Sequence, residues 1–208
     1  MALVKHIFNL AERWEIIDKS PSRNVRSLED NNQKERFLSL EEMQRLLDAL
    51  NTCKSESLPD IIEFLMLTGA RKAEAVELEW KEIDMDKAMW TLPSERNKAK
   101  KQKVIPLSDS AMAVLERRKG NDSEYVFPNP KTGKPMREVF RSWDRIRKAA
   151  GLDDVRIHDL RHSYASFLVN SGRSLYEVQK LLGPSQLSTT QRHAHFAHGN
   201  GARFFVSH

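Results

Sequence analysis

The spacing of apolar residues predicts helices along most of the chain. Over Val4–Ile17, apolar side chains recur every three or four residues, as on one face of an amphipathic helix. Ser39 and Glu42 form a capping-box pattern, and the apolar positions that follow predict a second helix: Met43, Leu46, Leu47 and Leu50. Pro59 then opens the crowded apolar segment IIEFLMLTG, which predicts a buried helix capped by Gly69.

Five further segments are predicted to be helical. RKAEAVELEW comes first, and a helix capped by Ser108 ends at Gly120. REVFRSWDRIRKAAG is helical up to Gly151, and HDLRHSYASFLVNSG follows it. The last predicted helix, SLYEVQKLLG, begins with a second capping box that pairs Ser174 with Glu177.

The character of the chain changes between these helices. AMWTL and KVIPL are short β-prone runs on either side of a long charged turn, which predicts a hairpin with a basic tip. EYVFPNPKTGKP predicts a short strand followed by turns. The expected fold is therefore mainly α with a small antiparallel β-sheet, in the α+β class.

A polar segment, SPSRNVRSLEDNNQKER, has no periodicity and is interpreted as a linker. We therefore expect a helix over 1–20, a linker over 21–36, a principal domain over 37–197 and a tail over 198–208. The first helix is interpreted as the end of another domain that this chain mostly lacks. The alternative is that this helix folds back onto the principal domain.

The composition narrows the class of protein. In 208 residues, 39% are hydrophobic and 30% are charged, and no apolar run is long enough to cross a bilayer. Acidic residues interrupt the first apolar stretch and no small-residue cleavage site follows it, so we expect no signal peptide. The single Cys53 excludes an internal disulfide and a Cys-rich zinc module. These features favour a cytoplasmic protein.

The net charge of +5 favours an anionic partner. Basic residues gather in RNKAKKQK, ERRK and RSWDRIRK, although each cluster is also compatible with a solvated face. Four polar residues stand where helices begin or the hairpin turns: Arg71, Lys98, His158 and Arg161. Taken singly, each has an ordinary explanation as a solvated cation or a helix-capping pair.

Several motifs follow one another in a distinctive order: TGARKAEAVELEW, a lysine-tipped hairpin closing on VIPL, HDLRHSYASFLVNSG, SLYEVQKLLG and STTQR. Taken in this order they resemble the tyrosine recombinase (phage integrase) family, and the resemblance covers Phe37 to Ala197. It implies that family's catalytic-domain fold, site-specific DNA integration and recombination through a covalent 3′-phospho-enzyme intermediate, and no cofactor. It also implies double-stranded DNA at an attachment site as partner, self-association on DNA, no membrane, and a bacterial or phage-encoded, nucleoid-associated protein. The helix at 1–20 resembles the end of the family's core-binding domain.

The resemblance assigns roles to particular residues. Arg71 and Arg161 match the family arginines, whose guanidinium groups neutralise charge on the phosphate in the transition state. Lys98, eight residues before Pro106, matches the lysine that protonates the departing 5′ oxygen, and His158 matches the histidine that handles the nucleophile's proton. Glu74 stands where the family often has an acid that orients the first arginine, and alternatively is an exposed helix carboxylate. Hairpin residues expected to contact DNA phosphates are Arg96, Lys100, Lys101 and Lys103.

Two positions depart from the family pattern. Pro184 stands where the family has His or Trp as a phosphate donor, and proline offers neither a side-chain donor nor a backbone N–H. His193 stands at the position of the nucleophilic tyrosine. Imidazole can form a phosphoramidate, but its nitrogen reaches about 2 Å less far than a phenolic oxygen. We expect strand cleavage to be severely weakened and DNA binding to survive.

Two other functions stay open from sequence. One is a non-catalytic DNA-binding or regulatory protein on a recombinase scaffold, which would bind DNA in a salt-dependent way without forming a covalent adduct. The other is a metal-dependent phosphodiesterase that uses His193, His195 and His198, with His208 as a further ligand. HxHxxH without nearby Cys or carboxylate is a weak zinc signal, so no metal is expected. The tail GNGARFFVSH is interpreted either as an interaction segment or as a free end.

Overall fold

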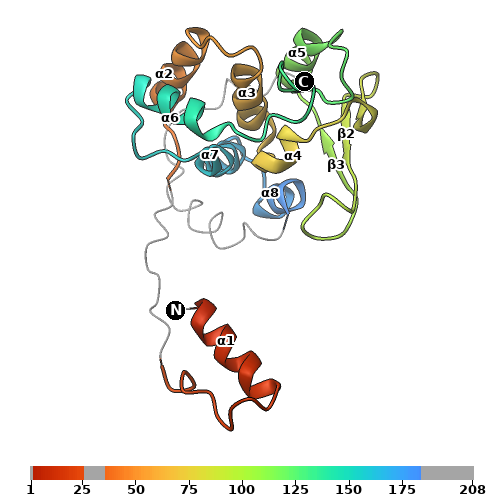
Figure 1. The fold of residues 1–208 in the computed structure, drawn as a ribbon. Coiled ribbons are helices and arrows are strands. Elements are labelled where there is room, and N and C mark those ends of the chain that lie inside the picture. Colours follow the sequence, from red (N-terminus) through yellow and green to blue (C-terminus); the bar gives the residue numbers. More distant parts are fainter. Residues whose placement is uncertain (1, 26–35, 184–208) are drawn as a thin grey trace. The chain divides into compact units, whose positions relative to one another are not determined.

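The computed structural model describes residues 2–25 and 36–183 (Figure 1). By its internal contacts the chain divides into two compact units, 1–34 and 35–208. In the first unit, helix α1 spans Ala2–Arg13 and ends four residues before the predicted end at Ile17. It stops because Glu15 adopts a left-handed backbone (φ 56°) and the Ile16 N–H bonds back to the Ala11 carbonyl at 2.9 Å, as in a Schellman cap.

The second unit is mainly helical with one small sheet, so the predicted fold class is confirmed. Its described elements are α2 (Leu40–Asn51), α3 (Leu58–Thr68), α4 (Lys72–Val76), the 3-10 turn η1 (Trp80–Glu82), β1 (Ile83–Asp84), β2 (Met89–Leu92), β3 (Lys103–Pro106), α5 (Asp109–Arg118), α6 (Phe140–Ala149), α7 (Ile157–Asn170) and α8 (Leu175–Leu182). The strands run in the order β1-β2-β3, and both pairs are antiparallel.

Both predicted capping boxes are present. At the start of α2, the Glu42 N–H donates to Ser39 Oγ at 3.2 Å, and the Ser39 N–H donates to a Glu42 carboxylate oxygen at 2.9 Å. Ser174 and Glu177 make the same reciprocal pair at the start of α8. Each pair satisfies N–H groups that have no partner within the helix, so these two helix starts are fixed by local sequence.

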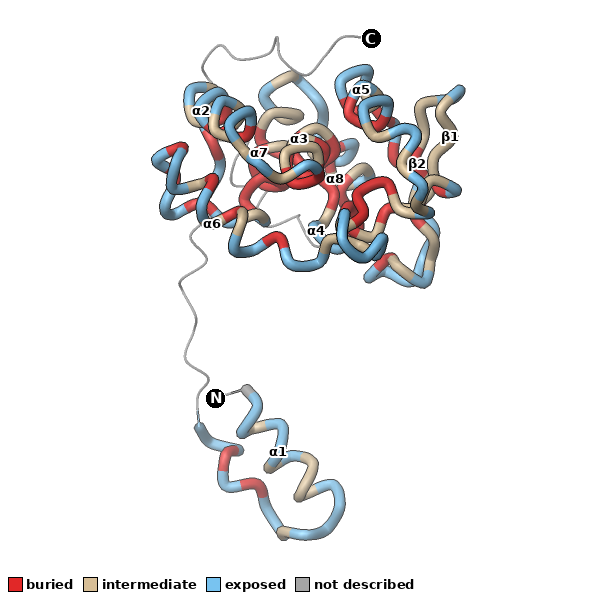
Figure 2. Tube along the Cα trace, turned by 45° about the horizontal axis from the view of Figure 1, so that its top comes forward, coloured by how far each residue is buried: buried red, intermediate tan, exposed pale blue. Residues whose placement is uncertain are grey.

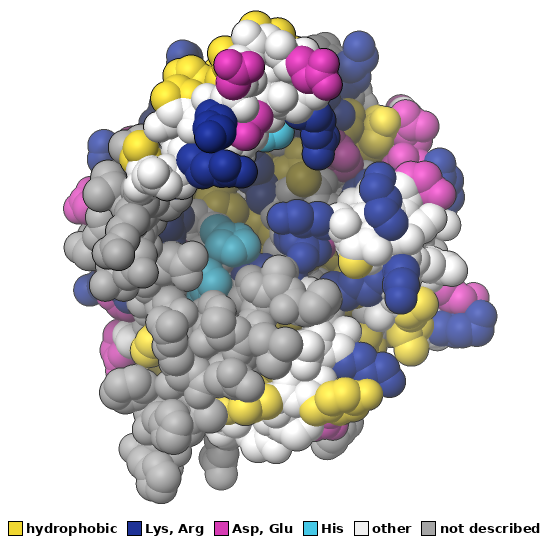
Figure 3. Space-filling model, turned by 90° about the horizontal axis from the view of Figure 1, so that it is seen from below, with side chains coloured by type: hydrophobic (Ala, Val, Ile, Leu, Met, Phe, Trp, Pro, Cys, Tyr) yellow, Lys and Arg dark blue, Asp and Glu magenta, His cyan; other side chains and the backbone are white. Residues whose placement is uncertain are grey.

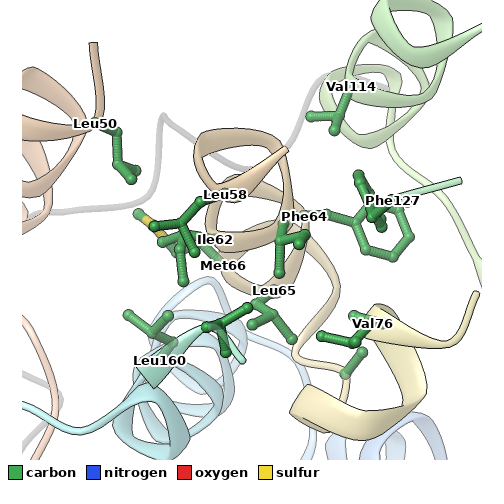
Figure 4. Packing of buried hydrophobic residues seen from close by; sticks show 14 of the residues in the cluster. Leu50, Leu58, Ile62, Phe64, Leu65, Met66, Val76, Val114, Phe127 and Leu160 are labelled. Atoms are coloured by element: carbon green, nitrogen blue, oxygen red, sulfur yellow. The ribbon is translucent and has the colours of Figure 1, made fainter. Parts of the chain in front are cut away.

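Helix α3 is the centre of the core. Most of its length is buried, and it packs against α2, α4, α5 and α7 (Figure 2). Figure 4 shows its side chains directed at residues of several other elements, including Val114 and Leu160. The ring of Phe64 lies 5.7 Å from that of Trp90 and 5.6 Å from that of Phe127, measured between centroids. Helix α3 thus fixes the positions of the helices and of the sheet around it.

The prediction for RKAEAVELEW is wrong in its second half. The helix ends at Val76, and the backbone then extends so that Glu79 forms an antiparallel bridge with Tyr125. The Val126 N–H donates to the Leu78 carbonyl at 2.9 Å, which uses groups that a longer helix would have kept. The strand predicted in EYVFP is correspondingly reduced to two isolated bridges, this one and a second between Pro128 and Pro135.

Gly69 ends α3 as predicted and also meets a second constraint. It adopts a left-handed backbone with φ 61°, and its N–H donates to the Leu65 carbonyl. A β-carbon at this position would lie 2.3 Å from a ring carbon of Tyr164 and 2.8 Å from a methyl of Leu182. Glycine is therefore required by backbone conformation and by the close packing of α7 and α8.

Gly69→Ala should lower the free energy of unfolding by about 3 kcal/mol. A left-handed L-residue costs about 1–2 kcal/mol and the overpacked β-carbon adds about as much. Urea unfolding checks this, with Gly151→Ala as the matched control, because Gly151 has φ 67° and its β-carbon would meet nothing within 4 Å. Equal losses in the two variants would contradict the packing constraint.

Candidate active site

Arg71 and Glu74 form a cap at the start of α4. Once the chain has turned at Gly69, Arg71 lies in the N-cap position of α4. Its backbone N–H donates to one carboxylate oxygen of Glu74 at 2.9 Å, and its Nη1 donates to the other at 2.6 Å. The Arg71 side chain keeps 24% of its surface exposed while that of Glu74 keeps 3%. Glu74 is therefore a buried brace, not an exposed helix carboxylate, and it aims a cation that remains accessible.

The ionisation of Glu74 depends on its neighbours. Burial alone raises the pKa of its carboxyl group, but the two hydrogen bonds from Arg71 and the charges of Arg71 and Lys103 outweigh burial. The net result is a pKa below its ordinary value. Glu74 is therefore ionised at neutral pH and fixes the orientation of Arg71.

Arg161 is a buried cation held by backbone. It lies in the second turn of α7 and is 1% exposed. Its Nη1 donates to the Gly69 carbonyl at 2.6 Å and its Nη2 donates to the Leu182 carbonyl. Burial, together with the charge of Arg71, lowers its pKa to about 10, against the opposing effect of Glu74. Among the described residues, its Nε has no hydrogen-bond acceptor.

His158 lies in the first turn of α7, close to this cluster. Partial removal from water and the charge of Arg161 are the main causes that lower its pKa below the ordinary 6.5. Its ring and the ring of His162 form a T-shaped pair, with centroids 4.8 Å apart and planes at 87°. His158 is therefore neutral at physiological pH, the state in which an imidazole can accept a proton.

Lys98 is on the exposed tip of the β2–β3 hairpin. Residues 93–101 are folded around the buried Asn97, whose Nδ2 donates to the Lys101 carbonyl at 2.6 Å and whose Oδ1 accepts the Ala99 N–H at 3.1 Å. In the described parts of the chain Lys98 makes no hydrogen bond or ion pair. The structure therefore does not bring Lys98 into contact with the arginines, and Lys100 and Lys101 are also exposed on this tip.

Arg96 and Lys103 do not lie on the exposed tip of the hairpin with the other basic residues predicted to contact DNA. Arg96 pairs with the buried Glu82 and donates to the Glu74 carbonyl at 2.8 Å, while Glu82 also accepts the Trp90 indole N–H at 3.1 Å. The guanidinium of Arg96 is thus already bonded to Glu82 and to the Glu74 carbonyl at the base of the hairpin. Lys103 is half-buried beside Glu74. The sequence carried one signal for the partial burial of Lys103. In a strand it shares a face with the apolar Ile105, two residues further on.

Basic side chains are numerous on one face of the molecule, as Figure 3 shows. Pro184, His193 and the histidines that follow lie outside the described residues. Over the residues that are described, no group of three or more His, Cys, Asp or Glu could hold a metal ion. None of the helices in the same residues is long and apolar enough to span a membrane.

Comparison with known sequences connects this geometry to one family. The family model described as Phage integrase family matches residues 36–199. The integrase of Salmonella phage P22 is 30% identical over 210 residues, which cover 95% of this chain and 53% of that protein. Tyrosine recombinase XerC of Staphylococcus epidermidis is 32% identical over 174 residues, covering 76% and 56% respectively. The chain thus spans about half the length of these curated relatives.

Solved structures share the fold at low sequence identity. The Tn1549 transposon integrase, solved in complex with a circular intermediate DNA, superposes with a TM-score of 0.74 at 18% identity, over 91% of this chain and 71% of that one. The catalytic domain of bacteriophage HP1 integrase superposes with a TM-score of 0.61 at 24% identity, over 77% and 88%. These similarities establish the fold of the second unit.

Glu74→Gln should destabilise the protein in a pH-dependent way. At pH 7 the free energy of unfolding should fall by about 2 kcal/mol, because a buried ion pair loses its anion. The pKa of Glu74 is lowered on folding, so its contribution is present above the ordinary value of 4.5 and is lost as the pH falls through the folded pKa. Urea unfolding between pH 7 and pH 3 should show the two proteins converging.

Glu177→Gln is the matched control for this test. Glu177 makes the same capping-box geometry at the start of α8, but on an exposed helix end. Its replacement should change stability much less than Glu74→Gln does. A similar loss in both variants would mean that helix capping, not the buried pair with Arg71, explains the effect.

Proposed function

Because this chain belongs to the phage integrase family, we propose that it is the catalytic part of a site-specific DNA recombinase. The observation that carries the proposal is the convergence of Arg71, its buried brace Glu74 and the buried Arg161 at the end of α3. Two guanidinium groups in one place suit a phosphodiester, whose oxygens they bind as charge grows in the transition state. Within the larger recombinase, residues 37–197 form the catalytic domain and 1–20 the end of a core-binding domain.

The proposed reaction is a phosphoryl transfer. The nucleophile attacks phosphorus and forms a covalent 3′-phospho-enzyme bond, the bond from phosphorus to the 5′ oxygen breaks, and that oxygen takes a proton. Lys98 is the proposed donor, which requires the hairpin tip to approach bound DNA. His158, neutral at physiological pH, is suited to accept the nucleophile's proton. The exposed Lys100 and Lys101 would bind flanking phosphates.

The nucleophile position is where this chain departs from the family. His193 replaces the tyrosine, and its ring nitrogen falls about 2 Å short of the position of a phenolic oxygen. A misplacement of about 1 Å can cost about a hundredfold in rate. Pro184 removes a phosphate donor, which costs about 3 kcal/mol at comparable sites. We therefore propose that this chain binds DNA but cleaves it far more slowly than a chain with tyrosine would.

These two substitutions favour a second candidate, a DNA-binding protein on a recombinase scaffold that does not cleave. Phosphate binding depends on the arginines and the basic hairpin, and neither Pro184 nor His193 removes those groups. Such a protein would bind duplex DNA with an affinity that falls steeply with salt. It would form no covalent adduct under any solution condition.

Restoring the nucleophile tests the proposal. We expect His193→Tyr with Pro184→His to form a covalent protein–DNA adduct on a pool of nicked duplexes of randomised sequence, because a nick lets the cleaved end diffuse away and traps the intermediate. The unaltered chain should yield about a hundredfold less or none. Denaturing electrophoresis measures the adduct, and sequencing of the trapped DNA gives the target.

The control is Arg71→Lys in the restored background, which keeps the charge but loses the planar two-point contact. It should reduce the adduct by about a hundredfold. An acid-labile adduct from the unaltered chain would identify His193 as a working nucleophile and contradict the argument from reach. No adduct from any variant, combined with salt-dependent binding, would favour the non-cleaving protein.

A further inference from the structure

Lys103 lies on the buried face of the sheet, unlike the exposed lysines of the hairpin tip. In β3, Ile105 is 3% exposed whereas Val104 and Pro106 are exposed. Side chains two residues apart share a face of a strand, so Lys103 points to the same side as Ile105. Its partner in the register is Leu92, which is fully buried. Lys103 therefore extends toward α4 and away from the solvent around Lys98.

The charges that surround Lys103 do not balance. Among the described residues, Glu74 is the one carboxylate whose charge acts on Lys103, beside the cations Arg71 and Arg161, and both of its oxygens already accept hydrogen bonds from Arg71. In the part of the chain that the structure describes, Lys103 makes no hydrogen bond or ion pair. His158 adds no charge at neutral pH because its pKa is lowered. A half-buried cluster with an excess of cations is unfavourable unless an anion joins it.

The titration of Lys103 agrees with this geometry. Removal from water is the main cause that lowers its pKa, and the charges of Arg161 and Arg71 lower it further against the opposing effect of Glu74. The resulting pKa is about 8. The ammonium group is therefore mostly protonated at pH 7 but loses its proton readily above pH 8. A bound anion would raise its pKa and keep the group protonated.

We propose that Lys103 contacts the scissile phosphate as a third cation beside Arg71 and Arg161, and that this phosphate supplies the anion that the cluster lacks. The inference rests on the proposed function and adds to it a residue distinct from the exposed lysines of the hairpin tip. Two consequences follow. The free protein is destabilised by the charge of Lys103. Above pH 8, DNA binding is accompanied by the uptake of a proton.

Lys103→Met separates these consequences from a general effect of charge. It should raise the melting temperature of the free protein by about 3 °C, since an uncompensated cation is replaced by an apolar side chain of similar length. It should also weaken binding to a short duplex of random sequence about tenfold and reduce the slope of log affinity against log salt by about one. The matched control, Lys100→Met on the exposed tip, should reduce the slope similarly without stabilising the protein.

The pH profile gives an independent measurement. Affinity of the unaltered chain for the duplex should fall about tenfold between pH 7 and pH 9, because a group with a pKa near 8 must be protonated again on binding. Lys100→Met should retain this fall and Lys103→Met should lose it. Lys103→Arg keeps the charge at all these pH values, so it should bind with the parent salt slope and a flat pH profile.

The possible failures are distinguishable. If the unaltered chain shows no salt-dependent binding to duplex DNA, the proposed function is wrong and the inference falls with it. If the chain binds but Lys103→Met leaves the affinity, salt slope and pH profile unchanged, only the role of Lys103 is overturned. A lower melting temperature for Lys103→Met would likewise contradict the charge imbalance, and the Lys103→Arg profile would then decide whether Lys103 contributes to binding.

Discussion

The buried guanidinium of Arg161 connects the two helix ends on which the site is built. Its acceptors, the carbonyls of Gly69 and Leu182, lie at the C-terminal ends of α3 and α8, where the partial negative charge of a helix accumulates. Among the described residues no carboxylate forms an ion pair with Arg161. The arginine is thus held by backbone dipoles, and under the proposed function a phosphate oxygen would meet no counter-ion from the described residues. The same two bonds align α7 with the helices on either side.

Around this connection the molecule separates rigid support from reactive groups. The base of the hairpin is braced by Glu82, which accepts hydrogen bonds from Arg96 and Trp90. Beyond the brace the lysines of the tip are exposed. Positive charge is therefore present in two forms. Part is engaged in ion pairs that fix the framework, and part is exposed on the hairpin tip, where the proposed function requires cations for DNA phosphates.

Features set by neighbouring residues could be predicted from the sequence, and features set by distant contacts could not. Capping boxes and the cap at Gly69 depend on a few adjacent side chains, and the structure has them as predicted. The helix predicted through Trp80 ends early, at Val76, because residues near Val126 compete for its backbone hydrogen bonds. The ion pair between Arg96 and Glu82 could not be predicted, because charge runs do not distinguish solvated cations from paired ones. In the sequence, Lys103 is distinguished from the neighbouring lysines only because it shares a strand face with Ile105. A pattern of two residues is too short to predict burial.

The several demands on Gly69 have a consequence for how this fold can change over evolutionary time. The residue turns the chain out of α3, leaves room for Tyr164 and Leu182, and presents its carbonyl to Arg161. A position with one task can drift when a single neighbour compensates for it. Here, compensation would require simultaneous changes in three helices, a path that single substitutions cannot follow through stable intermediates. The end of α3 is therefore expected to be a fixed point around which the rest of the sequence diverges.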